Sequence, residues 1–285
     1  MGCRPSYESP SRMYESHWQL NQKPFENCCD PRFYFPGESH QAALLKLRYA
    51  IENRRGGAIL AGPSGSGKTL IVAMLRTTLA EEFAPFVHLV FPQMSADQLL
   101  AYLADELTGS ADGSLASDVQ NSIRRIEHFL ADNTRDGRHA VVAVDEAHLV
   151  DDGRAFEAMR LLLNFELAGR PGLTLLLAGQ PGILPTLDRM PQLEERVGVK
   201  CLLRPFTERE TADYVSHRLR LAGATRALFE PDALPTLHRL THGVARRINR
   251  LGDLALLIGY AEGRRTISAD HLEAVSQELI TVVPE

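Results

Sequence analysis

The chain has 285 residues, of which 44% are apolar and 24% charged, and this balance is typical of a globular protein of about two domains. No apolar run approaches the roughly 20 residues that cross a bilayer, and the polar start lacks the apolar core of a secretory signal, so we expect a soluble, cytoplasmic protein with no transmembrane segment. The net charge of -5 argues against a chain-wide affinity for nucleic acid, and neither a metal site nor a disulfide framework is predicted by the four cysteines, Cys3, Cys28, Cys29 and Cys201.

The N-terminal part of the chain predicts a helix and then a strand. Residues 1–12 are expected to be a disordered extension, because Met13 could equally be the first residue translated. Apolar residues recur at helical spacing over 40–53, with Ser39 as a plausible N-cap. The run GGAILAG at 56–62 is short, apolar and ends in glycine, which is typical of a buried parallel strand that leads into a loop.

The loop after this strand reads GPSGSGKT, and a helical pattern follows it. A GxxxxGK[ST] match alone could be a mere glycine turn, but strand, glycine-rich loop and helix here occur in the order that a phosphate-binding P-loop requires. Lys68 is expected to pair with the β- and γ-phosphates of a nucleotide, and the Thr69 hydroxyl to bind Mg²⁺. The residues expected to contact the nucleotide are Gly62, Pro63, Ser64, Gly65, Ser66, Gly67, Lys68, Thr69, Leu70 and Asp145.

Two further strands are predicted at 87–91 and 139–147, with helical patterns over 95–107 and 116–131 between them. The second strand ends in Asp145 and Glu146, two carboxylates at the carboxyl end of a strand, which is the Walker B arrangement. Asp145 is expected to belong to the Mg²⁺ shell. Glu146 is expected to polarise a water molecule toward the γ-phosphate as general base.

The letters DEAH at 145–148 also mark a large class of RNA helicases. Such helicases need two tandem RecA-like domains, and the roughly 140 residues that follow are too few for a second one. We therefore interpret DEAH as a Walker B strand followed by Ala-His. No chemistry is demanded of His148, which is interpreted as an ordinary loop residue or a hydrogen-bonding neighbour of the site.

The second half of the chain predicts two more strands and a helical tail. A helix is expected over 153–167, a strand within 171–184 that ends at Gln180, and a short strand within 191–206. Gln180 stands where a polar side chain could touch the attacking water. The sum is an α/β P-loop core with a parallel five-stranded sheet flanked by helices, followed by a small helical lid with helices over 207–222, 231–241, 244–261 and 268–280.

These motifs resemble those of AAA+ ATPases, and within that group the general secretion pathway protein A family, which includes pilus-biogenesis and exosortase-associated relatives. Transposition target-selection ATPases share much of the later pattern. The resemblance implies an AAA+ core over 13–205 and a helical lid over 206–285. It rests on Pro24-Phe25, DPRFYF, SHQAALLKLRYAI, GPSGSGKT, VDEAH, LAGQPGI and THGVARRINRLGDLAL, which together cover nearly the whole chain from Met13.

The resemblance also assigns catalytic roles beyond Lys68 and Glu146. Gln180 matches the sensor 1 position, and Arg246 matches the sensor 2 arginine that contacts the γ-phosphate. Arg196 matches an arginine finger, which would act on the nucleotide of a neighbouring subunit. Two alternatives stay open: Arg196 could pair with the adjacent Glu194 or Glu195, and Arg247 could take the place of Arg246, because Ala245 stands where the family usually has proline.

For function, the resemblance implies ATP and Mg²⁺ as cofactors and an ATP-dependent homo-oligomer. Larger members of the family carry a membrane span and a peptidoglycan-binding domain after the ATPase, and neither is found in this sequence. We therefore expect ATP hydrolysis to drive assembly of a secretion, pilus or polysaccharide-export machine through a partner protein of the membrane or envelope, with the chain itself at most peripheral at the inner membrane.

A DNA-binding regulator of transposition is the alternative. Arginines are frequent after residue 205, but acidic residues nearly balance them, and a solvated helical face is the ordinary interpretation of such a mixture. DNA is thus a possible but less favoured partner. A small-molecule P-loop kinase is a weaker alternative, because Glu146 suits activation of water.

Overall fold

Short apolar runs bounded by glycine become the strands of a parallel sheet in the computed structural model, which describes residues 13–110, 119–150 and 153–281. The extension expected over 1–12 lies outside these residues. The chain divides into two compact units, one formed by Asp30–Arg204 and the other by 13–29 together with the residues from Pro205 onward.

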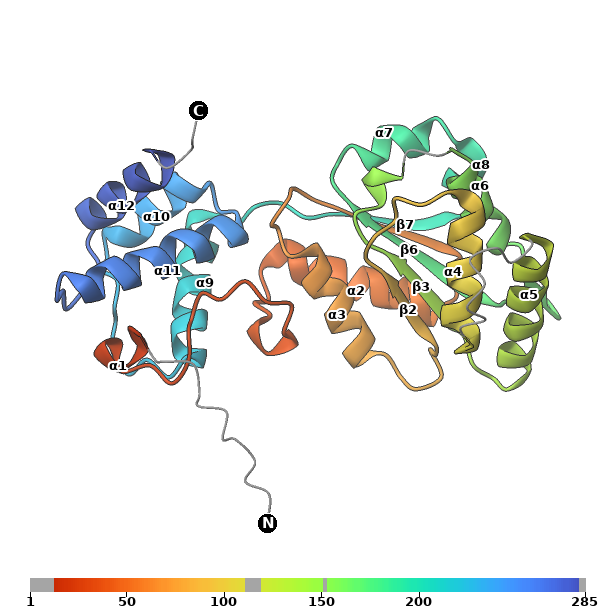
Figure 1. The fold of residues 1–285 in the computed structure, drawn as a ribbon, viewed down its shortest axis with the longest axis horizontal. Helices are drawn as coiled ribbons and strands as arrows, with labels where there is room; N and C mark the ends of the chain where they lie inside the picture. Colours follow the sequence, from red (N-terminus) through yellow and green to blue (C-terminus); the bar gives the residue numbers. More distant parts are fainter. Residues whose placement is uncertain (1–12, 111–118, 151–152, 282–285) are drawn as a thin grey trace, which may run out of the picture. The chain divides into compact units, whose positions relative to one another are not determined.

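The five strands of the main sheet of the first unit are all parallel to their neighbours, as predicted (Figure 1). Every residue of the three inner strands is buried, which explains why the sequence shows continuous apolar runs there. The order across the sheet is β2 (Phe86–Leu89), β3 (Ala140–Val144), β6 (Leu173–Gly179), β1 (Gly57–Ala61) and β7 (Val197–Leu202).

Helices cover both faces of this sheet, because successive strand side chains point to opposite faces. Ile59 packs into an apolar cluster with residues of α4, α5 and α6, whereas Leu60 packs into a second cluster with residues of α2 and α3. The α-helices of this unit are α2 (Glu38–Glu52), α3 (Lys68–Thr78), α4 (Ala96–Thr108), α5 (Val119–Arg135), α6 (Gly153–Leu162), α7 (Ile183–Asp188) and α8 (Pro191–Glu194).

Two local expectations for this unit are wrong. Helix α2 begins at Glu38, and its N-cap is Gly37 without a side-chain hydrogen bond, so Ser39 is not the cap. The helix expected over 153–167 ends at Leu162, and an antiparallel hairpin of β4 (Glu166–Leu167) and β5 (Arg170–Pro171) follows. The two-residue Ala-Gly turn of this hairpin has positive φ at both positions, a backbone conformation that the alanine does not signal in the sequence.

The second unit is helical, and its C-terminal helices agree with the predicted ones to within two residues at each end. Thr207 and Glu210 form a reciprocal capping box at the start of α9. The helices are α1 (Glu15–Trp18), α9 (Glu208–Leu221), α10 (Ala233–Thr241), α11 (Ala245–Ala261) and α12 (Ala269–Thr281).

Residues 13–29 belong to this helical unit. They do not belong to the ATPase core, in which the family resemblance places them. Trp18 is buried and donates its indole N–H to the carbonyl of Leu256 in α11 at 2.9 Å. Phe25 is also buried against α11, where a Cβ added at Gly252 would come within 2.9 Å of the Phe25 ring. The segment has no helical or strand periodicity, so only these contacts reveal which unit it joins.

Candidate nucleotide-binding and hydrolysis site

The carboxyl ends of the three inner strands bring the predicted motifs together. Ala61 of β1 lies opposite Gly179 of β6, and the N–H of Gly62 donates to the Gly179 carbonyl at 3.1 Å. Val144, the last residue of β3, lies opposite Leu177 of β6. The P-loop, the Walker B carboxylates and the residue after β6 therefore leave the sheet side by side, at the edge where parallel α/β sheets bind their ligands.

The loop of 62–67 has a backbone that requires glycine. Gly65 and Gly67 have φ of 77° and 96°, in the left-handed region that side chains disfavour. A Cβ at Gly62 would lie 2.9 Å from both the Leu203 Cβ and the Ser66 hydroxyl. Gly67 is also the N-cap of α3, so the loop ends at the amino terminus of a helix, where the free N–H groups and the helix dipole favour an anion.

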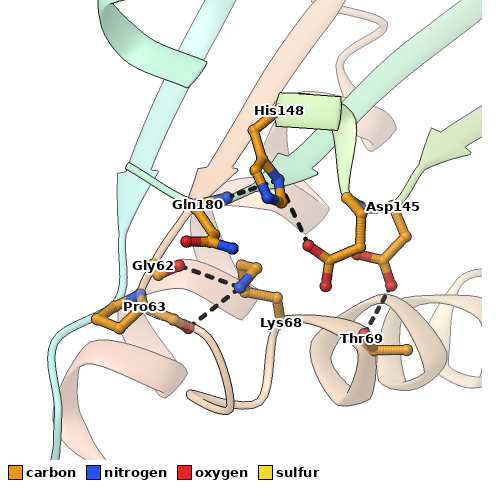
Figure 2. A network of polar contacts seen from close by, with 8 residues as sticks. Gly62, Pro63, Lys68, Thr69, Asp145, His148 and Gln180 are labelled. Carbon is orange, nitrogen blue, oxygen red and sulfur yellow. Dashed lines mark hydrogen bonds and ion pairs between the residues drawn. The ribbon is translucent and has the colours of Figure 1, made fainter. Parts of the chain in front are cut away.

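Lys68 lies across this loop and is only 4% exposed. Its ammonium group donates to the carbonyls of Gly62 at 3.0 Å and Pro63 at 3.1 Å (Figure 2). A buried positive charge is costly unless it is paired. The position of this charge inside a glycine loop, at a helix amino terminus, suits the phosphates of a nucleotide.

Thr69 and Asp145 meet beside the loop. The Thr69 hydroxyl donates to Asp145 Oδ2 at 2.6 Å (Figure 2). The Glu146 N–H donates to Asp145 Oδ1 at 2.9 Å. Burial alone would raise the pKa of Asp145, but the neighbouring His88, the Thr69 hydroxyl and the Glu146 N–H together hold the pKa below its ordinary value. The carboxylate is therefore ionised at neutral pH.

These oxygen atoms fit a magnesium ion, which prefers hard oxygen ligands and keeps several from water or phosphate. No group of three or more His, Cys, Asp or Glu side chains that could hold a metal occurs in the described part of the chain. Thr69 and Asp145 would thus hold the ion only together with the nucleotide, in the manner expected for a P-loop protein.

Glu146 has a strained backbone and an accessible side chain. Its φ and ψ are 47° and 34°, the left-handed conformation that costs a non-glycine residue about 1 kcal/mol or more. The side chain is 38% exposed, in contrast to the buried Asp145. Of the two Walker B carboxylates, Glu146 is the one that a water molecule could reach.

Gln180 follows β6 and lies beside the same group of residues. Its backbone N–H donates to His148 Nδ1 at 3.3 Å, and Figure 2 shows its side chain directed toward Lys68. His148 Nδ1 also lies 3.4 Å from Glu146 Oε2. The structure thus places His148 in contact with both Glu146 and the sensor 1 candidate, so it is a hydrogen-bonding neighbour of the site.

Arg196 lies at the end of the sheet opposite to the P-loop, beside the amino end of β1. Its carbonyl accepts the N–H of Gly57, the first residue of β1, whereas the P-loop leaves the other end of that strand. The guanidinium donates to Asn164 Oδ1 at 2.8 Å. Glu194 pairs with Lys200 at 2.6 Å, so the Glu194 ion pair considered for Arg196 is not formed.

Arg246 and Arg247 are both exposed in the first turn of α11. The helix begins at Ala245, with Val244 as its N-cap. The alanine thus takes the first helical position, where a proline is also tolerated. The sensor 2 role of Arg246 stays a prediction.

His40 is a site neighbour that the sequence did not single out. It is buried in α2, and its Nε2–H donates to the carbonyl of Ser66 in the P-loop at 2.8 Å. A Cβ at Gly67 would lie 3.6 Å from the same ring. The only signal in the sequence was a histidine at a core position of an amphipathic helix, and that is more often a packing residue than a functional one.

No helix in the described ranges is both long and apolar enough to cross a membrane.

Comparison with known proteins gives a family and a fold. Residues 51–187 match the family described as AAA domain. General secretion pathway protein A of Aeromonas hydrophila is 32% identical over 269 residues, which are 94% of this chain and 48% of the relative, so the chain spans about half the length of that protein.

Solved structures share the fold at low identity. Cdc6p of Pyrobaculum aerophilum has a TM-score of 0.72 at 16% identity, over 92% of this chain and 74% of its own. The ORC2 protein of Aeropyrum pernix has a TM-score of 0.65 at 19% identity, over 90% and 72%. The RuvB branch migration motor of Thermotoga maritima has a TM-score of 0.58 at 19% identity, over 84% and 69%. The chain therefore has the fold of AAA+ proteins, matches an AAA domain over residues 51–187, and is similar to general secretion pathway protein A along 94% of its length.

Proposed function

We propose that the chain binds ATP with Mg²⁺ at the P-loop and hydrolyses it with Glu146 as general base, and that this cycle drives assembly of an envelope machine through a partner protein. The hydrolysis proposal rests on one observation: the side chains of Lys68, Thr69, Asp145 and Glu146 lie together at the carboxyl ends of the inner strands. The envelope role rests on the similarity to general secretion pathway protein A along 94% of the chain.

Each residue has a part that follows from its position. Lys68 neutralises the β- and γ-phosphates, exchanging its bonds to loop carbonyls for bonds to phosphate oxygens. Thr69 and Asp145 would hold a magnesium ion, which would supply stabilisation of the charge on the phosphates. Glu146 takes a proton from the attacking water, and Gln180 orients that water.

Arg196 is proposed to complete the site of a neighbouring subunit. Its guanidinium lies at the edge of the sheet opposite to the P-loop of its own chain, so a role in catalysis requires a second copy. Arg246 keeps the sensor 2 role that the family resemblance gives it. We therefore propose an ATP-dependent homo-oligomer, located in the cytoplasm and held at the inner membrane, if at all, through its partner.

The alternative, a DNA-binding regulator of transposition, is favoured by one observation. Arg246, Arg247 and Arg250 follow one another around the start of α11, all three are exposed, and none of them makes an ion pair among the described residues. Unpaired arginines on one helical turn would suit phosphate groups.

Steady-state hydrolysis separates the two. ATP turnover is measured over a range of protein concentrations, with and without duplex DNA, at low and high salt. A specific rate that rises with protein concentration and ignores DNA is expected for a self-assembling ATPase that acts on a protein partner. Strong stimulation by DNA that fades as salt rises would replace the envelope proposal with the DNA alternative.

A further inference from the structure

His148 has no part in the mechanism above, yet its ring lies between two of the residues that do. Its Nδ1 atom is 3.3 Å from the backbone nitrogen of Gln180 and 3.4 Å from Glu146 Oε2 (Figure 2). Its side chain is 15% exposed. A Cβ at Gly179 would lie 3.1 Å from the His148 nitrogen and 3.4 Å from Nδ1, so the glycine at the end of β6 provides the space that lets the ring lie there.

The two contacts of Nδ1 need opposite states of that atom. The N–H of Gln180 is a donor, so its hydrogen bond requires a lone pair on Nδ1. Ionised Glu146 is an acceptor, so a bond to its carboxylate requires a proton on Nδ1. One proton therefore decides whether His148 binds the backbone after β6 or the carboxylate of Glu146.

We propose that His148 is a positioning residue that gates Glu146 by its own protonation. With Nδ1 unprotonated, His148 holds the Gln180 backbone and leaves the Glu146 carboxylate free to accept a proton from water. With Nδ1 protonated, the imidazolium forms an ion pair with Glu146, and the base is withdrawn while the P-loop is unaffected. The inference rests on the proposed role of Glu146 as general base.

The surrounding charges suit such a gate. The acidic groups of this part of the site are Asp145 and Glu146, which follow β3. The basic group is Lys68, the first residue of α3. Two further imidazoles lie near the site: His40 of α2 donates to the Ser66 carbonyl of the P-loop, and Nε2 of His88 in β2 lies 3.7 Å from Asp145 Oδ2, beside the other carboxylate. A positive charge on the His148 ring would therefore act on Glu146, whereas one on the His88 ring would act on Asp145.

The test is the pH dependence of ATP hydrolysis, with kcat and KM measured separately between pH 8.5 and 5.5. In the wild type we expect kcat to fall at least about fivefold toward the acid end while KM changes less than about twofold, because the gate withdraws the base and not the binding site. In His148→Asn, whose amide does not titrate, kcat should change less than about twofold over the same range.

The control is His128→Asn, an exposed histidine of α5, which should keep the wild-type profile. Binding of a fluorescent ADP analogue shows that each variant retains a folded site. Any of three results would overturn the gate. The wild type could show no fall of kcat toward acid pH, His148→Asn could show the same fall as the wild type, or His88→Asn could be the variant that removes the fall. Separately, a Glu146→Gln variant that hydrolyses ATP at the wild-type rate would refute the role of Glu146 as the base.

Discussion

At the scale of single residues, the P-loop lysine shows how a buried charge identifies a binding site. Lys68 is almost fully buried, and its ammonium group donates to two backbone carbonyls of the loop (Figure 2). Neutral carbonyls compensate a buried charge less well than phosphate oxygens do. The residue is thus positioned for an anionic ligand.

Lys68→Ala should accordingly weaken ATP binding by at least about 100-fold, the equivalent of losing a charge-assisted contact with two phosphates. Titration of a fluorescent ATP analogue measures the affinity. Lys46→Ala, an exposed lysine of α2, is the matched control and should bind as the wild type does. Unchanged affinity in Lys68→Ala would remove the P-loop assignment.

At the scale of elements, the histidine that immediately precedes β3 has a structural role. His139 precedes the strand and is fully buried, with Nδ1 3.1 Å from the carbonyl of Pro171 and Nε2 2.8 Å from the Thr174 hydroxyl. Burial, together with the charge of Arg54, lowers its pKa to about 4. The folded state therefore holds this imidazole neutral.

This shift makes the stability of the ATPase unit depend on pH. A histidine whose pKa falls from about 6.5 in the unfolded chain to about 4 in the folded one stabilises the fold above pH 6.5, and this stabilisation is lost as the pH falls toward 4. Between pH 7.5 and 5 the loss should be about 2 kcal/mol. Urea unfolding of the wild type and His139→Asn measures it, and equal pH dependence in both would contradict the assignment.

The N-terminal segment is held on the helical unit by a buried arginine. Arg218 of α9 is 2% exposed, and it donates to the carbonyls of Pro24 and, at 2.7 Å, of Glu26. These bonds connect residues that are nearly two hundred positions apart in the sequence. The arginine therefore ties the segment of 13–29 to the helices.

Arg218→Met should destabilise the helical unit by about 2 to 4 kcal/mol, because buried carbonyls lose their donors. Amide hydrogen exchange should show faster exchange in 13–29. Arg220→Met, an exposed arginine of the same helix, serves as the control and should change little. Unchanged exchange in Arg218→Met would mean that the aromatic contacts alone hold the segment.

The elements differ in how well the sequence predicted them. The P-loop and the Walker B strand were predictable because their chemistry needs residues that are adjacent in sequence, and buried parallel strands appear as continuous apolar runs. The β4–β5 hairpin and the 13–29 segment were not, because the hairpin has only two residues in each strand and the segment is held by contacts with distant helices. The contact of His148 with Glu146 also required the fold, since Gly179 provides its space.

At the scale of the whole molecule, the proposed role of Arg196 as an arginine finger requires a second copy of the chain. Arg196 is at the edge of the sheet that its own P-loop does not reach. A mixture of Arg196→Ala and Lys68→Ala subunits should recover part of the hydrolysis that each variant lacks, because the second variant supplies the arginine and the first binds the nucleotide. The ATPase rate of the mixture is measured over a range of ratios, and no recovery at any ratio would count against a finger that acts between subunits.

The proposed function makes the carboxyl ends of the inner strands the ATP site and Glu146 the base that hydrolyses ATP. The most direct test compares the wild type with Glu146→Gln for both ATP binding and turnover. The account predicts that the variant binds ATP with wild-type affinity and hydrolyses it at least about 100-fold more slowly, because an amide cannot accept the proton of the attacking water. Turnover by Glu146→Gln at the wild-type rate would contradict it.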